Sequence, residues 1–297
     1  MNGEKENQES IQKRSVFWAR ICLLTASILW SLSGFFTRLL QAEGDETLLH
    51  PLQMACYRVL FAAAGMIFFL RPSQVCFRKP MVPTVICFAI MNALFVSALA
   101  LGSAANAILL QYTSLIWFVL FSVLILKEKL DPKGLQSLVP GMLGIVVLVI
   151  GGWHKGEFSV MLIALGSGVT YAGVIVGIRS MKDVAPPWIT FLNHGFSGMV
   201  LLPFVISMPT PSSREWCILF LFGFLQMGLP YLLTARGLKV LSPQEAGILT
   251  LLEPLLNPLW AYCISPEKET WNLSTFVGGG LLLSALLWRY LPSFRKN

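Results

Sequence analysis

The sequence predicts an all-α integral membrane protein, with ten transmembrane helices arranged as two inverted five-helix repeats. Three observations support this fold class: the composition, the length of the apolar runs, and a correspondence between the two halves of the chain. Of the 297 residues, 55% are hydrophobic and only 12% are charged, whereas soluble domains carry about 25% charged residues. With a mean hydropathy of +0.69, the chain has too few charges to cover the surface of a soluble domain.

Ten apolar runs are long enough to cross a bilayer, which takes about 20 residues of helix. Lipid offers the backbone no hydrogen-bond partners, so these runs must be helices. They are too long for barrel strands and lack a period of two residues. The first run also exceeds the apolar core of a signal peptide, which is about 7–15 residues, so we expect it in the mature protein. The predicted spans are 17–40, 51–70, 80–101, 104–126, 134–152, 158–179, 187–207, 215–237, 244–264 and 273–291.

Basic residues gather on one side of this predicted arrangement. Of the 22 Lys and Arg residues, 17 fall on the side of the N-terminal tail and Arg58 falls within a span. The four on the opposite side are Arg38, Lys155, Arg214 and Lys268. Because cytoplasmic segments of membrane proteins are enriched in Lys and Arg, we expect a multi-pass protein of the inner cell membrane with both termini in the cytoplasm. The net charge of +7 then reflects topology, and no nucleic-acid partner is expected.

A shift of 139 residues superposes features of the two halves. It places Gly34 on Gly173, Ala107 on Ala246, Glu128-Lys129 on Glu267-Lys268, and Gly141 on Gly280. Each half holds five predicted spans, an odd number, so the second half enters the membrane inverted, as in many transporters. Chance alignment of two leucine-rich halves is the alternative. The predicted organisation is a cytoplasmic tail at 1–16, a first repeat at 17–152, a second repeat at 158–291 and a cytoplasmic tail at 292–297.

Several short motifs fit one transporter family. They are Leu29-Trp30-Ser31, Arg58 after an acidic loop, LKEKL at 126–130, and Leu252-Glu253-Pro254 with its proline 13 residues before Glu267. On these motifs the whole chain resembles the drug/metabolite transporter superfamily, in its ten-span EamA-type branch. The departures are Leu115 at the proline position of the first half, Ser31 for a common glycine, and Lys127 and Pro266 where glycine usually precedes the two glutamates. The resemblance implies secondary active export of small polar metabolites such as amino acids, by alternating access.

Glu253 is the strongest candidate for substrate binding or coupling. A carboxylate within an apolar span costs about 2.5–3.5 kcal/mol on insertion scales, and such residues usually serve a function. Pro254 lacks a backbone donor, so it frees a carbonyl one turn earlier to face a cavity. The alternative is that Glu253 is a structural partner of Arg58 or of a neighbouring helix.

Arg58 and three aromatic residues complete the candidate site. Arg58 could bind an anionic substrate group, or extend its guanidinium outward to the acidic loop, which its position in the span favours. Trp30, Tyr171 and Trp260 lie away from span ends, where aromatic rings can bind a cation or line a cavity, although packing is the common alternative. We expect these three rings to share one central cavity with Glu253, between the two halves.

The absence of a phosphate-binding motif argues against one class of driving force. No GxxxxGK[ST] loop is present, so direct ATP drive is not expected and a proton gradient is a candidate driving force. We expect a small-molecule substrate and the lipid bilayer as partners, with no catalytic residues, no metal and no cofactor. A membrane-embedded enzyme and a non-transporting scaffold or sensor remain alternatives. The sequence leaves open the solute, the direction, the coupling ion and the oligomeric state.

Overall fold

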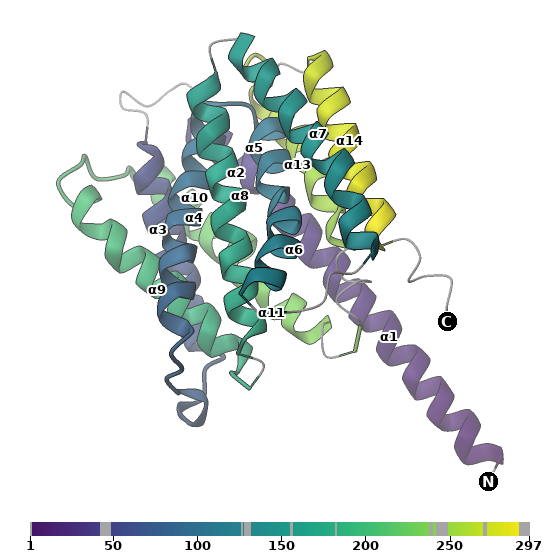
Figure 1. Cartoon of the computed structure of the whole chain (residues 1–297). Helices are drawn as coiled ribbons and strands as arrows, with labels where there is room; N and C mark the ends of the chain where they lie inside the picture. Colours follow the sequence, from purple (N-terminus) through teal and green to yellow (C-terminus); the bar gives the residue numbers. More distant parts are fainter. Residues whose placement is uncertain are drawn as a thin grey trace.

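A computed structural model describes residues 2–41, 49–125, 127, 132–154, 157–181, 183–237, 240–241, 249–269 and 272–290. Within these residues all regular structure is helical and no strand occurs, which confirms the all-α class. The helices run side by side in one bundle, and α1 extends beyond it at the N-terminal end (Figure 1).

The helices of the first half overlap the first five predicted spans, and α1 begins 15 residues before the first of them. They are α1 (Asn2–Ser31), α2 (Ser33–Leu40), α3 (Pro51–Ile67), α4 (Met81–Leu101), α5 (Ala104–Tyr112), α6 (Ser114–Leu124) and α7 (Pro132–His154), with a 3-10 turn η1 at Pro72–Gln74. Local chemistry sets the start of α3, where the His50 side chain accepts the backbone N–H of Leu52 and Gln53 accepts that of His50. Two orphan donors of the first turn are thus satisfied. The first predicted span is broken at Leu32, and the fourth at Thr113.

The second half continues in the same manner. Its helices are α8 (Phe158–Arg179), α9 (Pro186–Val205), α10 (Ser213–Leu221), α11 (Leu229–Gly237), α13 (Leu252–Ile264) and α14 (Leu273–Tyr290), with a π-helix η2 at Phe222–Gly228 between α10 and α11. Ser212 and Glu215 form a reciprocal capping box at the start of α10, with bonds of 3.3 and 2.6 Å. Such π-segments are frequent at functional sites, and η2 contributes to the cavity described below.

Within the described parts of the chain, five helical segments are long and apolar enough to cross a membrane. They are Gln12–Leu40, Met81–Leu101, Phe158–Ile178, Pro186–Val205 and Ser213–Thr234. Shorter apolar stretches lie at Pro51–Ile67, Val139–Gly151 and Leu273–Ala285. The outer faces are apolar as well: on α4, Val82, Ile86 and Ile90 recur every four residues with almost half of each side chain exposed. A lipid-facing helix surface requires such a stripe.

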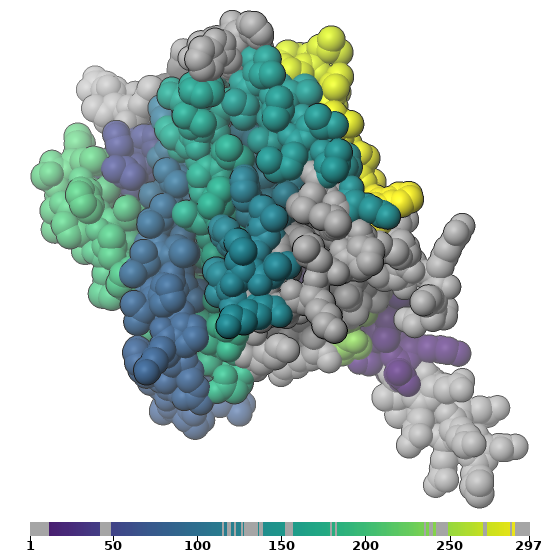
Figure 2. Space-filling view, viewed as in Figure 1, coloured from purple at the N-terminus to yellow at the C-terminus, as the bar shows by residue number. Residues whose placement is uncertain are grey.

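Helices of the two halves pack against each other. Helix α1 of the first half packs against α11 and α13 of the second half. Helix α8 of the second half packs against α4, α5 and α6 of the first half. The helix pairs α3–α9 and α7–α14 also join the halves. On the face shown in Figure 2, the surfaces of α4 (blue), α8 (green-teal) and α7 (teal) adjoin one another.

The α7–α14 contact depends on two facing glycines. A Cβ on Gly144 would lie 2.7 Å from the Gly278 carbonyl oxygen, and one on Gly278 would lie 2.9 Å from that of Gly144. Neither distance leaves room for a side chain, so the two backbones touch. Close approach through small residues is the usual way in which helices associate within lipid, where no hydrophobic effect drives them together.

Candidate functional site: a central cavity between the two halves

A cavity of about 290 Å³ lies in the middle of the bundle. Side chains from α1, α3, α4, α5 and α6 of the first half and from α8, η2, α11 and α13 of the second half line it. Four of the five predicted site residues are among them: Trp30, Arg58, Tyr171 and Glu253. The cavity is close to the lower limit of small-molecule sites, which is about 300 Å³.

Glu253 is in the first turn of α13 and presents its carboxylate to the cavity. The Tyr112 hydroxyl is 2.8 Å from Glu253 Oε2 and 2.8 Å from the Thr250 carbonyl oxygen. A hydroxyl has one hydrogen, so it can donate to only one of these two acceptors at a time. Glu253 Oε1 accepts no hydrogen bond from the described residues. This carboxylate therefore retains acceptor capacity for a ligand.

Arg58 is buried, with 1% of its surface exposed. Its Nε and Nη2 donate to Asn92 Oδ1 at 3.1 and 2.7 Å, and Nη1 is 3.5 Å from Gln226 Oε1. The rings of Phe95 and Phe222 lie 6.0 and 5.0 Å from the guanidinium carbon. The expectation that Arg58 extends outward to the acidic loop is therefore wrong. Arg58 is instead held inside the bundle by polar partners, above all Asn92 of α4. The sequence alone does not show that these two residues meet.

Arg58 and Glu253 do not form an ion pair, and both belong to the part of the chain that the structure describes. Asn92 itself is held by its Nδ2, which donates to the Ala55 carbonyl at 2.9 Å and to Ser197 Oγ at 3.1 Å. The guanidinium is thus positioned by neutral groups. A buried cation with only neutral partners is electrostatically incomplete, and an anionic group would complete it.

Aromatic rings from several helices line part of the cavity. The Trp30 and Tyr231 rings meet edge to face, with centroids 5.4 Å apart, and Tyr171 and Tyr112 line the same space. The break between α1 and α2 leaves the Trp30 carbonyl available, and Gln226 Nε2 donates to it at 3.0 Å. This bond joins the broken helix to η2. Sequence reasoning missed Tyr112 and Tyr231, whose only signal was a tyrosine inside an apolar span.

Trp260 is not among the residues that line the cavity, contrary to the expectation for it. Its Nε1 donates to Ser31 Oγ at 2.9 Å, and one turn away Asn257 Nδ2 donates to Ser33 Oγ at 2.6 Å. Both bonds hold α13 against the break between α1 and α2. Trp260 therefore contacts this seam rather than the cavity, and Pro258 lies between it and Glu253 in α13.

A buried histidine packs against the Tyr231 ring. His194 Nδ1 is 2.7 Å from the Thr190 carbonyl oxygen, and its ring lies 5.2 Å from that of Tyr231 and 4.8 Å from that of Phe88. Its Nε2 has no hydrogen-bond partner among the described residues. The Nδ1 bond is to its own helix, one turn earlier, so His194 does not join two helices through it.

Comparison with known proteins places the chain in a transporter family. The profile of the EamA-like transporter family matches residues 17–150 and again residues 158–291. An uncharacterized transporter of Archaeoglobus fulgidus is 30% identical over 213 residues, which are 69% of this chain and 76% of that protein. The uncharacterized transporter YxxF of Bacillus subtilis is 23% identical over 191 residues, 60% of each chain.

A solved crystal structure has the same fold. It superposes with a TM-score of 0.63 at 19% sequence identity, over 93% of this chain and 98% of that chain. The two family matches together cover most of the chain. The protein is a membrane transporter, and it belongs to the EamA-like transporter family.

Proposed function

We propose that this protein is a secondary active transporter that exports small zwitterionic metabolites such as amino acids, by alternating access at the central cavity. One observation carries the proposal: a guanidinium and a carboxylate line the same cavity of about 290 Å³ without pairing with each other. A solute with one carboxylate and one ammonium group would supply an oppositely charged partner to Arg58 and to Glu253.

The chemistry of the two groups matches such a solute. Arg58 offers N–H donors to a carboxylate in the planar geometry that suits it. Glu253 has a free oxygen for an ammonium group, and the rings of Trp30 and Tyr171 on the same cavity can attract a cation through their faces. Both charges remain inside the protein, so the cavity favours a solute that is neutral overall.

The contacts between the halves support the inverted repeat that alternating access needs. Under the 139-residue shift, α1 corresponds to α8, and α11 and α13 correspond to α4 and to α5–α6. The packing of α1 against α11 and α13 thus has its counterpart in the packing of α8 against α4, α5 and α6. The pairs α3–α9 and α7–α14 each join corresponding helices. A two-fold exchange of the halves would produce this pattern, and rocking one half against the other would expose the cavity to each side in turn.

Direction and orientation belong to the proposal as well. The bias of basic residues supports cytoplasmic termini in an inner cell membrane, and outward movement follows the family resemblance. The two alternatives from the sequence, an embedded enzyme and a non-transporting scaffold or sensor, both predict that no solute crosses the membrane. Family membership favours transport over either.

Flux into proteoliposomes tests the proposal. The purified full chain is reconstituted, and counterflow of radiolabelled neutral amino acids is measured one at a time, with and without a proton gradient. We expect saturable uptake of at least one amino acid, and weaker competition by its decarboxylated amine and by its deaminated acid. Absence of flux for every amino acid, or flux of the amine alone, would contradict the zwitterion proposal.

A further inference from the structure

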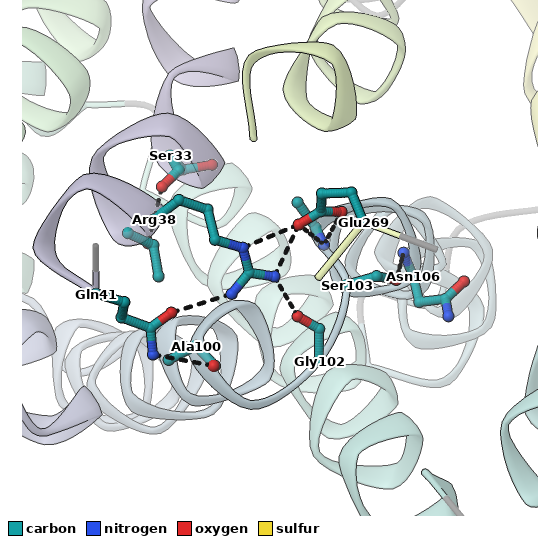
Figure 3. A network of polar contacts seen from close by, with 10 residues as sticks. Ser33, Arg38, Gln41, Ala100, Gly102, Ser103, Asn106 and Glu269 are labelled. Atoms are coloured by element: carbon teal, nitrogen blue, oxygen red, sulfur yellow. Dashed lines mark hydrogen bonds and ion pairs between the residues drawn. The ribbon is translucent and has the colours of Figure 1, made fainter. Parts of the chain in front are cut away.

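A second charged network lies at one end of the bundle, away from the cavity. Arg38, in the last turn of α2, forms a buried ion pair with Glu269, which lies between α13 and α14. Nη2 and Nε of Arg38 are 2.7 and 2.9 Å from Glu269 Oε1. Figure 3 shows the two side chains pointing towards each other. Their exposed fractions are 1% and 0%, so the pair is sealed from water.

Each partner of the ion pair is held further by the first half of the chain. Glu269 accepts the backbone N–H of Ala104 at 2.9 Å, at the first residue of α5, where the helix dipole favours an anion. Arg38 donates to Gln41 Oε1 at 3.0 Å and to the Gly102 carbonyl oxygen. The network therefore joins α2, the end of α4 and the start of α5 to the α13–α14 connection of the second half (Figure 3).

Between this network and the cavity lies a tightly packed layer. Asn257 Nδ2 donates to Ser33 Oγ at 2.6 Å. A Cβ on Gly34 would overlap the Asn257 side chain and lie 3.1 Å from the Cβ atoms of both Ala104 and Ala261. Small residues of α2, α5 and α13 thus close the bundle at this level. A solute could pass here only if α13 and its following segment separated from α2 and α5.

The inverted counterparts of the ion pair carry no charge. The 139-residue shift places Arg38 on Gly177 and Glu269 on Leu130. At Gly177 an added Cβ would collide with Thr84, so a long side chain has no space there. The two positions that the shift pairs with the buried Arg38–Glu269 contact are thus uncharged. Under the proposed topology, the ion pair described between the halves at the other end is the exposed one of Arg78 and Asp183.

We propose that Arg38 and Glu269 form a latch, which holds the α2 end of the bundle closed and biases the transporter towards the state whose cavity opens at the opposite end. When the halves separate at this end, both charges become hydrated, so the latch can open without leaving an unpaired charge in the interior. Under the proposed topology the closed end is the outer one. The latch rests on the proposed transport function, but its test requires no transported solute.

Thiol accessibility beneath the latch measures how often it opens. The six native cysteines are replaced, and Ser33→Cys is introduced as a buried reporter in oriented membrane vesicles. A membrane-impermeant sulfonate methanethiosulfonate is added on the latch side. In the double variant Arg38→Gln/Glu269→Gln, which removes both charges together, we expect labelling to be at least tenfold faster than with the latch intact. Arg38→Lys, which retains the charge but loses the fork of donors, should label at a rate between those of the intact protein and the double variant.

Controls separate latch opening from general damage. The matched pair Arg78→Gln/Asp183→Asn removes the exposed ion pair at 2.6 Å elsewhere in the protein and should leave Ser33→Cys labelling unchanged. If the double variant does not fold, Gln41→Leu removes one hydrogen bond from Arg38 without unpairing it, and about a threefold rise is expected. Unchanged labelling in the folded double variant, or in Gln41→Leu when that variant must be used, overturns the latch. Amino acid flux with an unchanged labelling rate would overturn the latch alone, whereas faster labelling without any flux would overturn only the proposed function.

Discussion

Replacing Glu253 with Gln is the most direct test of how the cavity recognises its solute. Gln keeps the shape of the side chain, and its amide oxygen can still accept the Tyr112 hydroxyl, so the protein should fold. The change removes the negative charge and one strong acceptor. If the ammonium group of the solute binds this carboxylate, only ligands that carry an ammonium group should be affected.

The expected size of the effect follows from the geometry. Tyr112 already occupies Glu253 Oε2 at 2.8 Å, so a bound ammonium has one free oxygen rather than two. One hydrogen bond to a charged group contributes about 1.5–3 kcal/mol, which is about 10- to 150-fold in affinity. A full Coulomb interaction at 4 Å with an effective dielectric constant of 20 gives about 4 kcal/mol as an upper bound. We expect a rise of about 10- to 100-fold in the half-saturating concentration.

Counterflow into proteoliposomes with paired competitors isolates the interaction. In the wild-type protein, the deaminated acid should compete at least tenfold more weakly than the amino acid itself. In Glu253→Gln the two should compete within about threefold of each other, because the partner of the ammonium group is gone. The matched control is Glu267→Gln, which changes an exposed carboxylate. Equal weakening of both competitors, or wild-type affinity in Glu253→Gln, would show that the carboxylate has only a structural role.

Three further predictions follow from other parts of the structure. Arg58→Lys should raise the half-saturating concentration about tenfold in the same counterflow assay. One ammonium group cannot replace the two hydrogen bonds of 2.7 and 3.1 Å to Asn92 and also bind the carboxylate of the solute. An unchanged half-saturating concentration would contradict this prediction. The hydrogen bond from the Arg78 guanidinium lowers the pKa of Asp183 in the folded protein. The Asp183 carboxylate therefore stabilises the fold at pH values above its unfolded pKa of about 3.9. This stabilisation is lost as the pH falls through the lower pKa of the folded protein. Asp183→Asn should thus lower the melting temperature slightly at pH 6 and not at pH 2, and an equal effect at both would refute the pairing. Single cysteines in a cysteine-free background should label from the inside only at Asp183 and from the outside at Glu157; the reverse pattern in intact cells would contradict the proposed topology.

Sequence predicted the positions of the helices well, because the length of an apolar run in lipid is set by bilayer thickness and backbone hydrogen bonding. It also indicated where some helices begin. Pro51 and Pro186 occupy the first helical position of α3 and α9, where the missing N–H has no cost. Sequence did not predict that the first and fourth spans would break at Leu32 and Thr113, since neither position carries Gly or Pro.

The direction in which each side chain points was harder to predict than the position of each helix. In a membrane helix both the lipid side and the protein side are apolar, so hydrophobic periodicity gives a weak signal. Trp30 and Tyr171 line the cavity, whereas Trp260 binds Ser31 instead. Arg58 was expected at the surface from its distance to the span end, but Asn92 on another helix holds it inside.

The latch was beyond sequence reasoning for a different reason. Arg38 and Glu269 are 231 residues apart, and each lies close to the end of a helix, where a charge is unremarkable by itself. The count of basic residues on the two sides of the membrane assigned Arg38 to the outer side, although only 1% of its surface is exposed. Only the fold brings the two together, and only burial distinguishes their contact from a surface ion pair of little energetic value.

The asymmetries between the halves bear on how such a transporter could prefer one state. A scaffold made of two equivalent inverted halves would open equally well to either side, so any preference must come from residues that break the equivalence. Glu253 corresponds to Ser114 under the 139-residue shift, and both line the cavity, so the ammonium site belongs to one half only. Gly177 cannot substitute for Arg38, because Thr84 fills the space that a side chain would need. On the proposed mechanism, the described contacts that close the opposite end are the close packing of α8 against α4 and the exposed ion pair of Arg78 and Asp183. Raising the ionic strength should then weaken the exposed Arg78–Asp183 pair before the buried Arg38–Glu269 pair, because buried pairs are screened less.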